Sequence, residues 1–114
     1  MANTFKVKTK ASVSHSSLAT VYTVPSSTTT VILGLTLANK TTSAITADVQ
    51  LSSDTSATET NADVFLLKGV SLPANSTLEV FGGQKIVLQT TDLIKAQAST
   101  ATSLDVALSI MEIT

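Results

Sequence analysis

Hydrophobic and polar residues alternate along much of this chain, and the clearest alternation lies at its C-terminal end. Between Ser103 and Ile113 every second residue is a large aliphatic one, namely Leu104, Val106, Leu108 and Ile110. This period of two predicts a β-strand with one buried face. A terminal segment with so many apolar residues is expected to pair within a sheet. Without such contacts, nothing would offset the conformational entropy lost when the segment becomes ordered.

Similar short segments precede this strand at intervals of about ten residues, a spacing typical of all-β sandwiches and barrels. They are residues 3–14, 21–24, 31–38, 45–51, 64–68, 77–81, 85–89 and 93–98. Residues 31–38 are apolar on both faces, which predicts a strand in the middle of a sheet or between two layers. The polar loop that follows predicts a β-hairpin between residues 31–38 and 45–51. Gly69 is expected to end a strand, and Gly82-Gly83 to form a tight hairpin connection.

No long segment has helical periodicity, so the chain is predicted to be all-β. We expect an antiparallel β-sandwich of eight or nine short strands, with the jelly roll among its candidate topologies. Residues 1–20 are expected to form an N-terminal strand or arm, and residues 21–114 the β-sandwich domain.

The N-terminal segment allows two interpretations. Phe5 and Val7 fall on one face, and Lys6, Lys8 and Lys10 on the other. The segment is then either an edge strand whose lysines discourage unwanted pairing, or an extended arm that crosses to a neighbouring subunit.

Composition narrows the function classes. The chain has 114 residues, seven lysines without arginine, eight acidic residues and a net charge of −1. A nucleic-acid partner is not expected, because no basic patch is available to neutralise phosphates. No membrane span or export signal is visible, so we expect synthesis in a cytoplasm. A surface this poor in charge is unusual for a free monomer and indicates burial in an assembly.

Candidate chemistry is sparse, and no enzyme, metal or cofactor is expected. His15, the single histidine, is flanked by serines whose side chains would point away from its ring on a strand. Asp54, Glu59 and Asp63 share the long polar loop after residue 51, but their spacing does not match a calcium-binding loop. Aromatic residues make up only 4% of the chain, with no tryptophan, which leaves no stacking platform for sugars or bases.

Residues Val21 to Thr114 resemble small virion proteins of tailed bacteriophages, of the type found in marine and cyanobacterial phages. The resemblance is carried by the order of three segments: VPSSTTTVILGLTLANKTTS, FLLKGVSLPANSTLEVFGGQKIVLQTTDLIKAQAS and the closing SLDVALSIMEIT. It implies a non-enzymatic structural protein that is present in many copies on the virion.

The leading hypothesis is a capsid decoration (cement) protein on the outer head, which binds the major capsid protein and forms a homo-oligomer, most simply a homotrimer. Its contacts are expected at Phe5 and Val7, and on the loop that carries Asp54, Glu59 and Asp63. One alternative is a neck, tail-adaptor or tail-fibre component of the virion. An alternative of another class is a carbohydrate-binding adhesion module.

Overall fold

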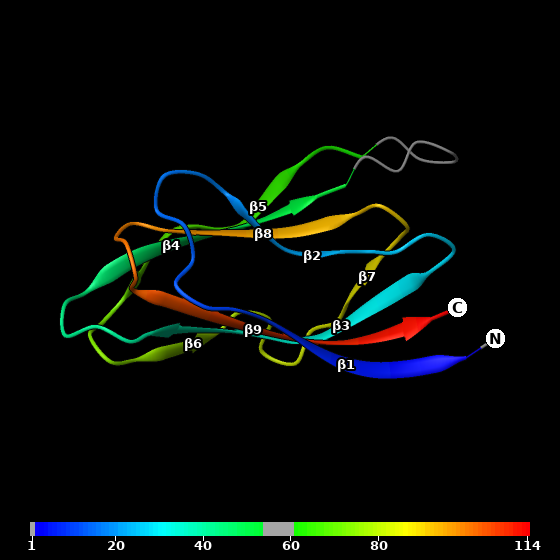
Figure 1. Ribbon diagram of the computed structural model, residues 1–114, viewed down its shortest axis with the longest axis horizontal. Coiled ribbons are helices and arrows are strands. Elements are labelled where there is room, and N and C mark those ends of the chain that lie inside the picture. Colours follow the sequence, from blue (N-terminus) through cyan, green and yellow to red (C-terminus); the bar gives the residue numbers. More distant parts are fainter. Residues whose placement is uncertain (1, 54–60) are drawn as a thin grey trace.

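The protein is an all-β molecule in the computed structural model, which describes residues 2–53 and 61–114 (Figure 1). No helix is found in these residues. The strands are β1 (Asn3–Lys10), β2 (Ala19–Thr23), β3 (Thr29–Asn39), β4 (Ile45–Ser52), β5 (Val64–Leu72), β6 (Thr77–Glu79), β7 (Ile86–Leu88), β8 (Leu93–Ala98) and β9 (Leu104–Ile113). They form two antiparallel sheets that face each other as two layers. The expected all-β class is confirmed.

One layer, which we call the β1 sheet, has the order β1-β9-β3-β6, with β7 also paired to β3. The other, the β2 sheet, has the order β2-β8-β4-β5. Strands β6 and β7 lie one after the other along the same side of β3, opposite Thr36–Ala38 and Thr30–Ile32 respectively. Counted as one interrupted strand, they complete four nested pairs: β1 with β9, β2 with β8, β3 with β6 and β7, and β4 with β5. Nested antiparallel pairs wrapped into two sheets are the jelly-roll arrangement.

The hydrophobic core fills the space between the two sheets. The alternation predicted for the last strand is observed in β9, whose Leu104, Val106, Leu108 and Ile110 are all at most 3% exposed. Strand β3 lies between β9 and the β6–β7 edge, so its expected central position is also confirmed. Ile94 and Val49 of the β2 sheet meet these side chains from the other layer. Because one face of each sheet is apolar, stacking the two faces removes both from water.

Three local expectations were wrong. Strands β3 and β4 do not form a hairpin, because they belong to different sheets and residues 40–44 cross from one layer to the other. Buried Asn39 secures this crossing: its amide nitrogen donates to the carbonyl oxygens of Ser43, Leu72 and Pro73 at 2.9–3.1 Å. Asn39, the last residue of β3, is thereby bonded both to the crossing segment, at Ser43, and to the C-terminal end of β5, at Leu72 and Pro73.

The other two wrong expectations concern glycines: Gly69 was expected to end a strand, and Gly82-Gly83 to form a hairpin connection. Strand β5 continues through Gly69, which takes a φ of 63° at an irregularity in the pairing with β4 and donates its N–H to Asp48 Oδ1 at 2.7 Å. Gly82 and Gly83 do have positive φ, but they lie between β6 and β7, which both pair with β3 and not with each other. Glycine thus marks a positive φ here without marking a strand end or a hairpin.

Candidate interaction surface

Strand β1 forms the edge of its sheet and is oriented with its apolar side outward. Its eight residues pair with β9 without a bulge, from Asn3 opposite Ile113 to Lys10 opposite Val106. Directly opposed residues of antiparallel strands share a face. Phe5 therefore lies beside Met111 on the outer face, whereas Lys6 and its neighbouring lysines lie on the face of the core residues of β9. Phe5 is 71% exposed and Val7 is 62% exposed.

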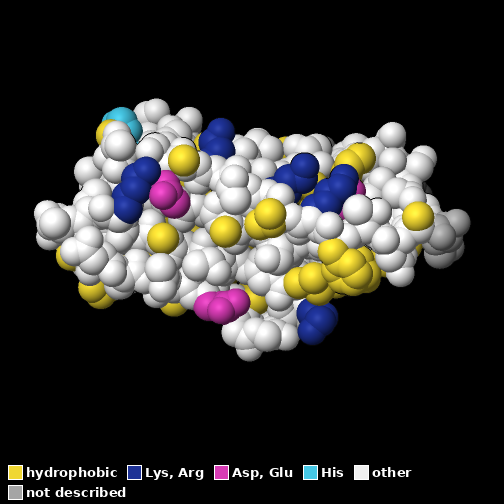
Figure 2. All heavy atoms as spheres, turned by 60° about the horizontal axis from the view of Figure 1, so that its bottom comes forward, with side chains coloured by type: hydrophobic (Ala, Val, Ile, Leu, Met, Phe, Trp, Pro, Cys, Tyr) yellow, Lys and Arg dark blue, Asp and Glu magenta, His cyan; other side chains and the backbone are white. Residues whose placement is uncertain are grey.

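These two side chains belong to a larger apolar surface. The strand registers place Phe5, Met111, Val31 and Val87 in one row across β1, β9, β3 and β7. Together with Val7 and Ile113 they form what we call the outer apolar patch. In Figure 2 hydrophobic side chains gather in one large cluster on this face, toward the end where Figure 1 shows both termini. A contiguous exposed apolar patch is characteristic of an interaction site.

The opposite end of the same face carries small side chains and is hollowed. A depression of about 260 Å³ lies there, and Thr9, Thr36, Ala38, Asp105 and Ala107 contribute to its lining. The registers place Thr9, Ala107 and Thr36 in a row across β1, β9 and β3, parallel to the row that contains Phe5. The outer face of the β1 sheet thus has a raised apolar half and a hollow half.

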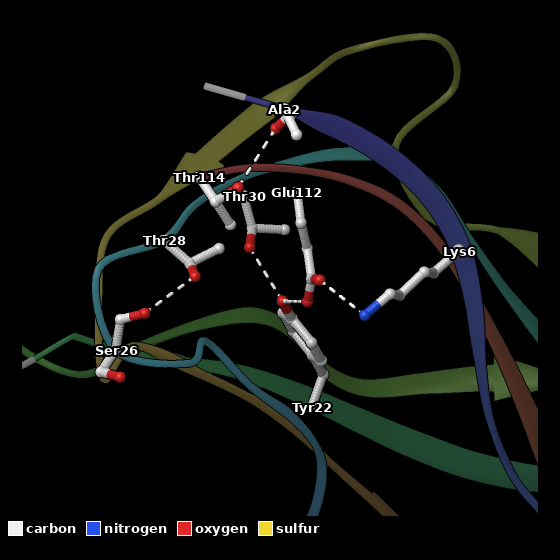
Figure 3. A network of polar contacts seen from close by, with 8 residues as sticks. All are labelled: Ala2, Lys6, Tyr22, Ser26, Thr28, Thr30, Glu112 and Thr114. Carbon is white, nitrogen blue, oxygen red and sulfur yellow. Dashed lines mark hydrogen bonds and ion pairs between the residues drawn. The ribbon is translucent and has the colours of Figure 1, made fainter.

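A buried polar network fixes the orientation of β1 (Figure 3). Glu112, on the core side of β9, is only 5% exposed. Its Oε1 is 2.8 Å from Lys6 Nζ, and its Oε2 accepts a hydrogen bond from Tyr22 O–H at 2.5 Å. The Tyr22 oxygen also lies 2.8 Å from Thr30 Oγ1. Because Tyr22 comes from the β2 sheet, the network joins both layers and the edge strand.

The network shifts two pKa values in opposite directions. The ion pair with Lys6, and then the hydrogen bond from Tyr22, lower the pKa of Glu112 below its ordinary value of 4.5. Burial, and then the hydrogen bond to Glu112, raise the pKa of Tyr22 to about 12. Glu112 is therefore held as a carboxylate and Tyr22 as a neutral phenol that donates to it.

A short connecting segment, residues 11–13, links β1 to the core. No residue of β1 is buried, but Val13, three residues beyond its end, is fully buried and donates its N–H to the Leu104 carbonyl at 2.8 Å. Between them, Ser12 has a φ of 51° and its N–H donates to Asp105 Oδ1 at 2.9 Å. Lys40 Nζ lies 2.9 Å from the same carboxylate oxygen. These contacts, that of the Ser12 N–H first, lower the pKa of Asp105.

The remaining residues singled out in the sequence are not brought to this surface. Asp63 is exposed directly before β5 and accepts a hydrogen bond from Ser52 Oγ at 3.0 Å. Asp54 and Glu59 lie outside the described residues, so the structure does not test the loop on which all three were placed. His15 is exposed, and its backbone carbonyl accepts from Gln97 Nε2 at 3.2 Å.

Two features are absent from the part of the chain that the structure describes. Residues 2–53 and 61–114 contain no group of three or more His, Cys, Asp or Glu side chains that could hold a metal ion. Over the same residues, no helix is long and apolar enough to cross a membrane.

Sequence reasoning named Phe5 and Val7 but missed Val31, Val87, Met111 and Ile113. The last strand did contain a clue to this surface. Continuing the alternation of buried residues beyond Ile110 places Glu112 on the buried face. Met111 and Ile113 consequently fall on the outer face, although both are apolar. A buried acid also requires partners, and those partners turned out to be Lys6 and Tyr22.

The chain was also compared with known proteins. No protein-family model matches it, and no curated protein or solved structure shows significant similarity to it.

Proposed function

We propose that this chain is a non-enzymatic structural protein of a bacteriophage virion, and specifically a capsid decoration protein that covers the outer head in many copies. The observation that carries the proposal is the outer apolar patch, in which an edge strand turns Phe5 and Val7 toward solvent and its lysines toward the core. Shifting the register of β1 by one residue would reverse this orientation. The retained orientation is favourable once a neighbouring protein on the particle covers the patch.

The size of the gain supports this interpretation. Full burial of an aromatic or branched aliphatic side chain contributes roughly 1.5–3 kcal/mol. Phe5, Val7 and Val87 are each more than 60% exposed and so have most of that burial still to gain. Several such side chains on one face would contribute a few kcal/mol in total, and on a repeating lattice further contacts with neighbouring copies would add to this contribution.

Fold and composition agree with the proposal. Jelly rolls occur in viral capsid proteins, and also in lectins and cupins, so the fold alone does not decide the function. The resemblance of residues 21–114 to small virion proteins favours the first of these classes. The mechanism would be mass action, since a protein that binds only the assembled shell stabilises that shell as its occupancy rises.

The proposal is tested by binding the purified protein to heads of the phage that encodes it, prepared without this protein. The informative variant lacks residues 2–10. This deletion stops before Val13, which is fully buried, so the core is preserved. We expect the variant to fold, as judged by its circular dichroism spectrum, and to lose binding to the heads.

The matched control is Phe65→Ala, because Phe65 is an exposed aromatic residue, 44% exposed, on strand β5 of the other sheet. This variant should bind as the wild type does. If the deletion variant bound the heads with unchanged affinity, the proposed surface would be wrong. If the wild-type protein bound only at the neck or tail of the particle, the assignment would move to an adaptor or fibre component.

A further inference from the structure

The free edge of strand β1 differs from the other sheet edges of the molecule (Figure 1). Strand β2 has only five residues, and its pairing with β8 shifts register between Thr20 and Tyr22. The pairing of β5 with β4 shifts register twice, and β6 and β7 have three residues each. Short and irregular strands discourage the addition of another strand at a sheet edge. Strand β1 has eight residues in unbroken register, so among the described strands it alone presents a long, regular edge.

This edge exposes backbone groups from every second residue of β1. Ala2 and Thr114 exchange both of their backbone hydrogen bonds, at 3.2 and 3.0 Å, and such pairs alternate along an antiparallel ladder. The even-numbered residues of β1 therefore bond to β9, and the odd-numbered ones direct their N–H and C=O groups away from it. The latter are Asn3, Phe5, Val7 and Thr9. Their backbone groups have no backbone partner in residues 2–53 and 61–114, so an added strand can bond to them.

The side chains of β1 define the chemistry of such a strand. Lys6, Lys8 and Lys10 lie on the core-facing side of β1, whereas Phe5 and Val7 lie on the outer side. Lys6 is paired with Glu112, but no described carboxylate lies within ion-pair distance of Lys8 or Lys10. Directly opposed residues of neighbouring strands share a face. Every second side chain of an added strand consequently meets this row of lysines.

We propose that β1 receives an extended strand of a partner protein in which acidic residues alternate with apolar ones. The inference rests on the proposed function, because it uses the strand that contacts the particle there, and it names the chemistry of the partner. The added strand runs antiparallel to β1 and exchanges backbone hydrogen bonds with Phe5 and Val7, a recurring mode of peptide recognition. Its acidic side chains face Lys8 and Lys10. Its apolar side chains extend the outer apolar patch, which stays open to a further contact.

The same lysines exclude a second copy of β1 as the occupant. An antiparallel pair centred on Val7 would set Lys6 against Lys8 of the other copy, and Lys8 against Lys6. Like charges that are directly opposed destabilise a pair of strands. The lysines therefore select a strand of opposite charge.

The other charged groups near β1 do not alter this selection. Asp105, at the far end of β1, is paired with Lys40, and Glu112 is paired with Lys6. Glu79 is exposed on the outer face, but it belongs to β6, on the other side of the sheet from β1. The ammonium groups of Lys8 and Lys10 thus remain for the added strand.

The first experiment uses a capped nine-residue peptide in which glutamate alternates with valine. The control peptide carries lysine in place of glutamate. The nitrogen of each charged residue is methylated, which prevents fibril formation and leaves the valine N–H groups free to bond to β1. Binding to the wild-type protein is followed by the fluorescence anisotropy of labelled peptide. We expect the Kd of the glutamate peptide to be lower by at least about tenfold, because attractive cross-strand pairs become repulsive in the control.

The position of the methyl groups tests the backbone pairing. In the proposed complex the valines stand opposite Phe5 and Val7, so their N–H groups bond to β1. A glutamate peptide that is methylated on its valine nitrogens has the same charge and composition but should not bind. Equal affinity of the two methylated glutamate peptides would overturn the proposed strand addition.

Charge selection is tested with protein variants. Lys8→Gln/Lys10→Gln removes both unpaired cations, so this variant should bind the glutamate and lysine peptides with similar affinity. The matched control is Lys85→Gln/Lys95→Gln, which makes the same change in net charge away from β1, directly before β7 and on β8. The control should keep the preference of the wild type. If Lys8→Gln/Lys10→Gln kept it too, these lysines would not select the partner.

Val7→Pro blocks the edge without removing a bond to β9. Proline is tolerated where the lost N–H faces away from the sheet, so we expect an unchanged far-ultraviolet circular dichroism spectrum and at least about tenfold weaker binding of the glutamate peptide. Amide hydrogen exchange of the wild type tests the same point without a substitution. The N–H groups of Phe5 and Val7 should exchange quickly in the free protein and slowly with the glutamate peptide bound. Unchanged exchange at both residues would show that the peptide does not add to this edge.

The outcomes separate this inference from the proposed function. If the glutamate peptide binds as described but the protein does not bind phage heads, the strand addition is retained and the virion assignment is wrong. If the protein binds heads through residues 2–10 but shows no preference for the glutamate peptide, the strand addition is wrong and the virion assignment is retained.

Discussion

Substituting Tyr22 by phenylalanine isolates the polar network that joins the two sheets, because only one hydroxyl group is removed and the buried ring stays in place. The hydroxyl donates to Glu112 Oε2 at 2.5 Å and lies 2.8 Å from Thr30 Oγ1. Glu112 is 5% exposed and Thr30 is fully buried, so water does not readily replace the lost partner. A hydrogen bond to a charged group contributes roughly 1.5–3 kcal/mol. We therefore expect the free energy of unfolding to fall by about 2–3 kcal/mol.

The loss should be measured by urea unfolding followed by far-ultraviolet circular dichroism, since the variant has neither tryptophan nor tyrosine. For a domain of this size the melting temperature should fall by roughly 10 °C. The comparison variant is Lys6→Met, which removes the other partner of Glu112. Lys6 is 42% exposed, so its ion pair is partly screened and its loss should cost only about 1 kcal/mol. A Tyr22→Phe protein within 0.5 kcal/mol of the wild type, on the order of the scatter for surface substitutions, would refute this reasoning.

Three further predictions follow from the same structure. Because the pKa of Glu112 is lowered in the folded state, its contribution to stability is present above the ordinary value of 4.5 and is lost as the pH falls through the folded-state pKa. Urea unfolding at acidic pH should show this loss of stability, and the loss should be smaller in Lys6→Met. Tyr22 is the only tyrosine, so ultraviolet absorbance should show phenol ionisation near pH 12 in the folded protein, and titration near pH 10 would contradict the buried hydrogen bond. Asn39→Ala should lower the free energy of unfolding by about 3 kcal/mol, because buried carbonyl groups lose their donor; an unchanged urea midpoint would show that Asn39 does not secure the crossing loops.

The strands could be predicted from the sequence because each carries its own pattern. In β9 and β8 a period of two coincides with a buried face, and in β3 the absence of a polar face coincides with a central position. The pairing of strands could not be predicted in the same way. Residues 40–44 are compatible with either a hairpin or a crossing between layers, and the two are distinguished by tertiary structure: the pairing of β4 with β5 and β8, and the contacts of Asn39 with Leu72 and Pro73.

The candidate surface was predicted only in part. Alternation in β1 separates Phe5 and Val7 from the lysines, but it does not reveal which side faces the core. That choice depends on the register with β9, which places Lys6 within reach of Glu112, about a hundred residues away in the chain. The hollow depends on small residues from three strands, so no single segment of sequence could have shown it.

The most direct test of the proposed virion assignment is the number of copies of this protein, relative to the major capsid protein, in purified virions of the proposed source phage. Quantitative mass spectrometry gives this ratio. We expect a copy number that scales with the number of capsid subunits, because a decoration protein covers the head. Its absence from the virion, or a number that fits only a single ring at the neck, would contradict the account.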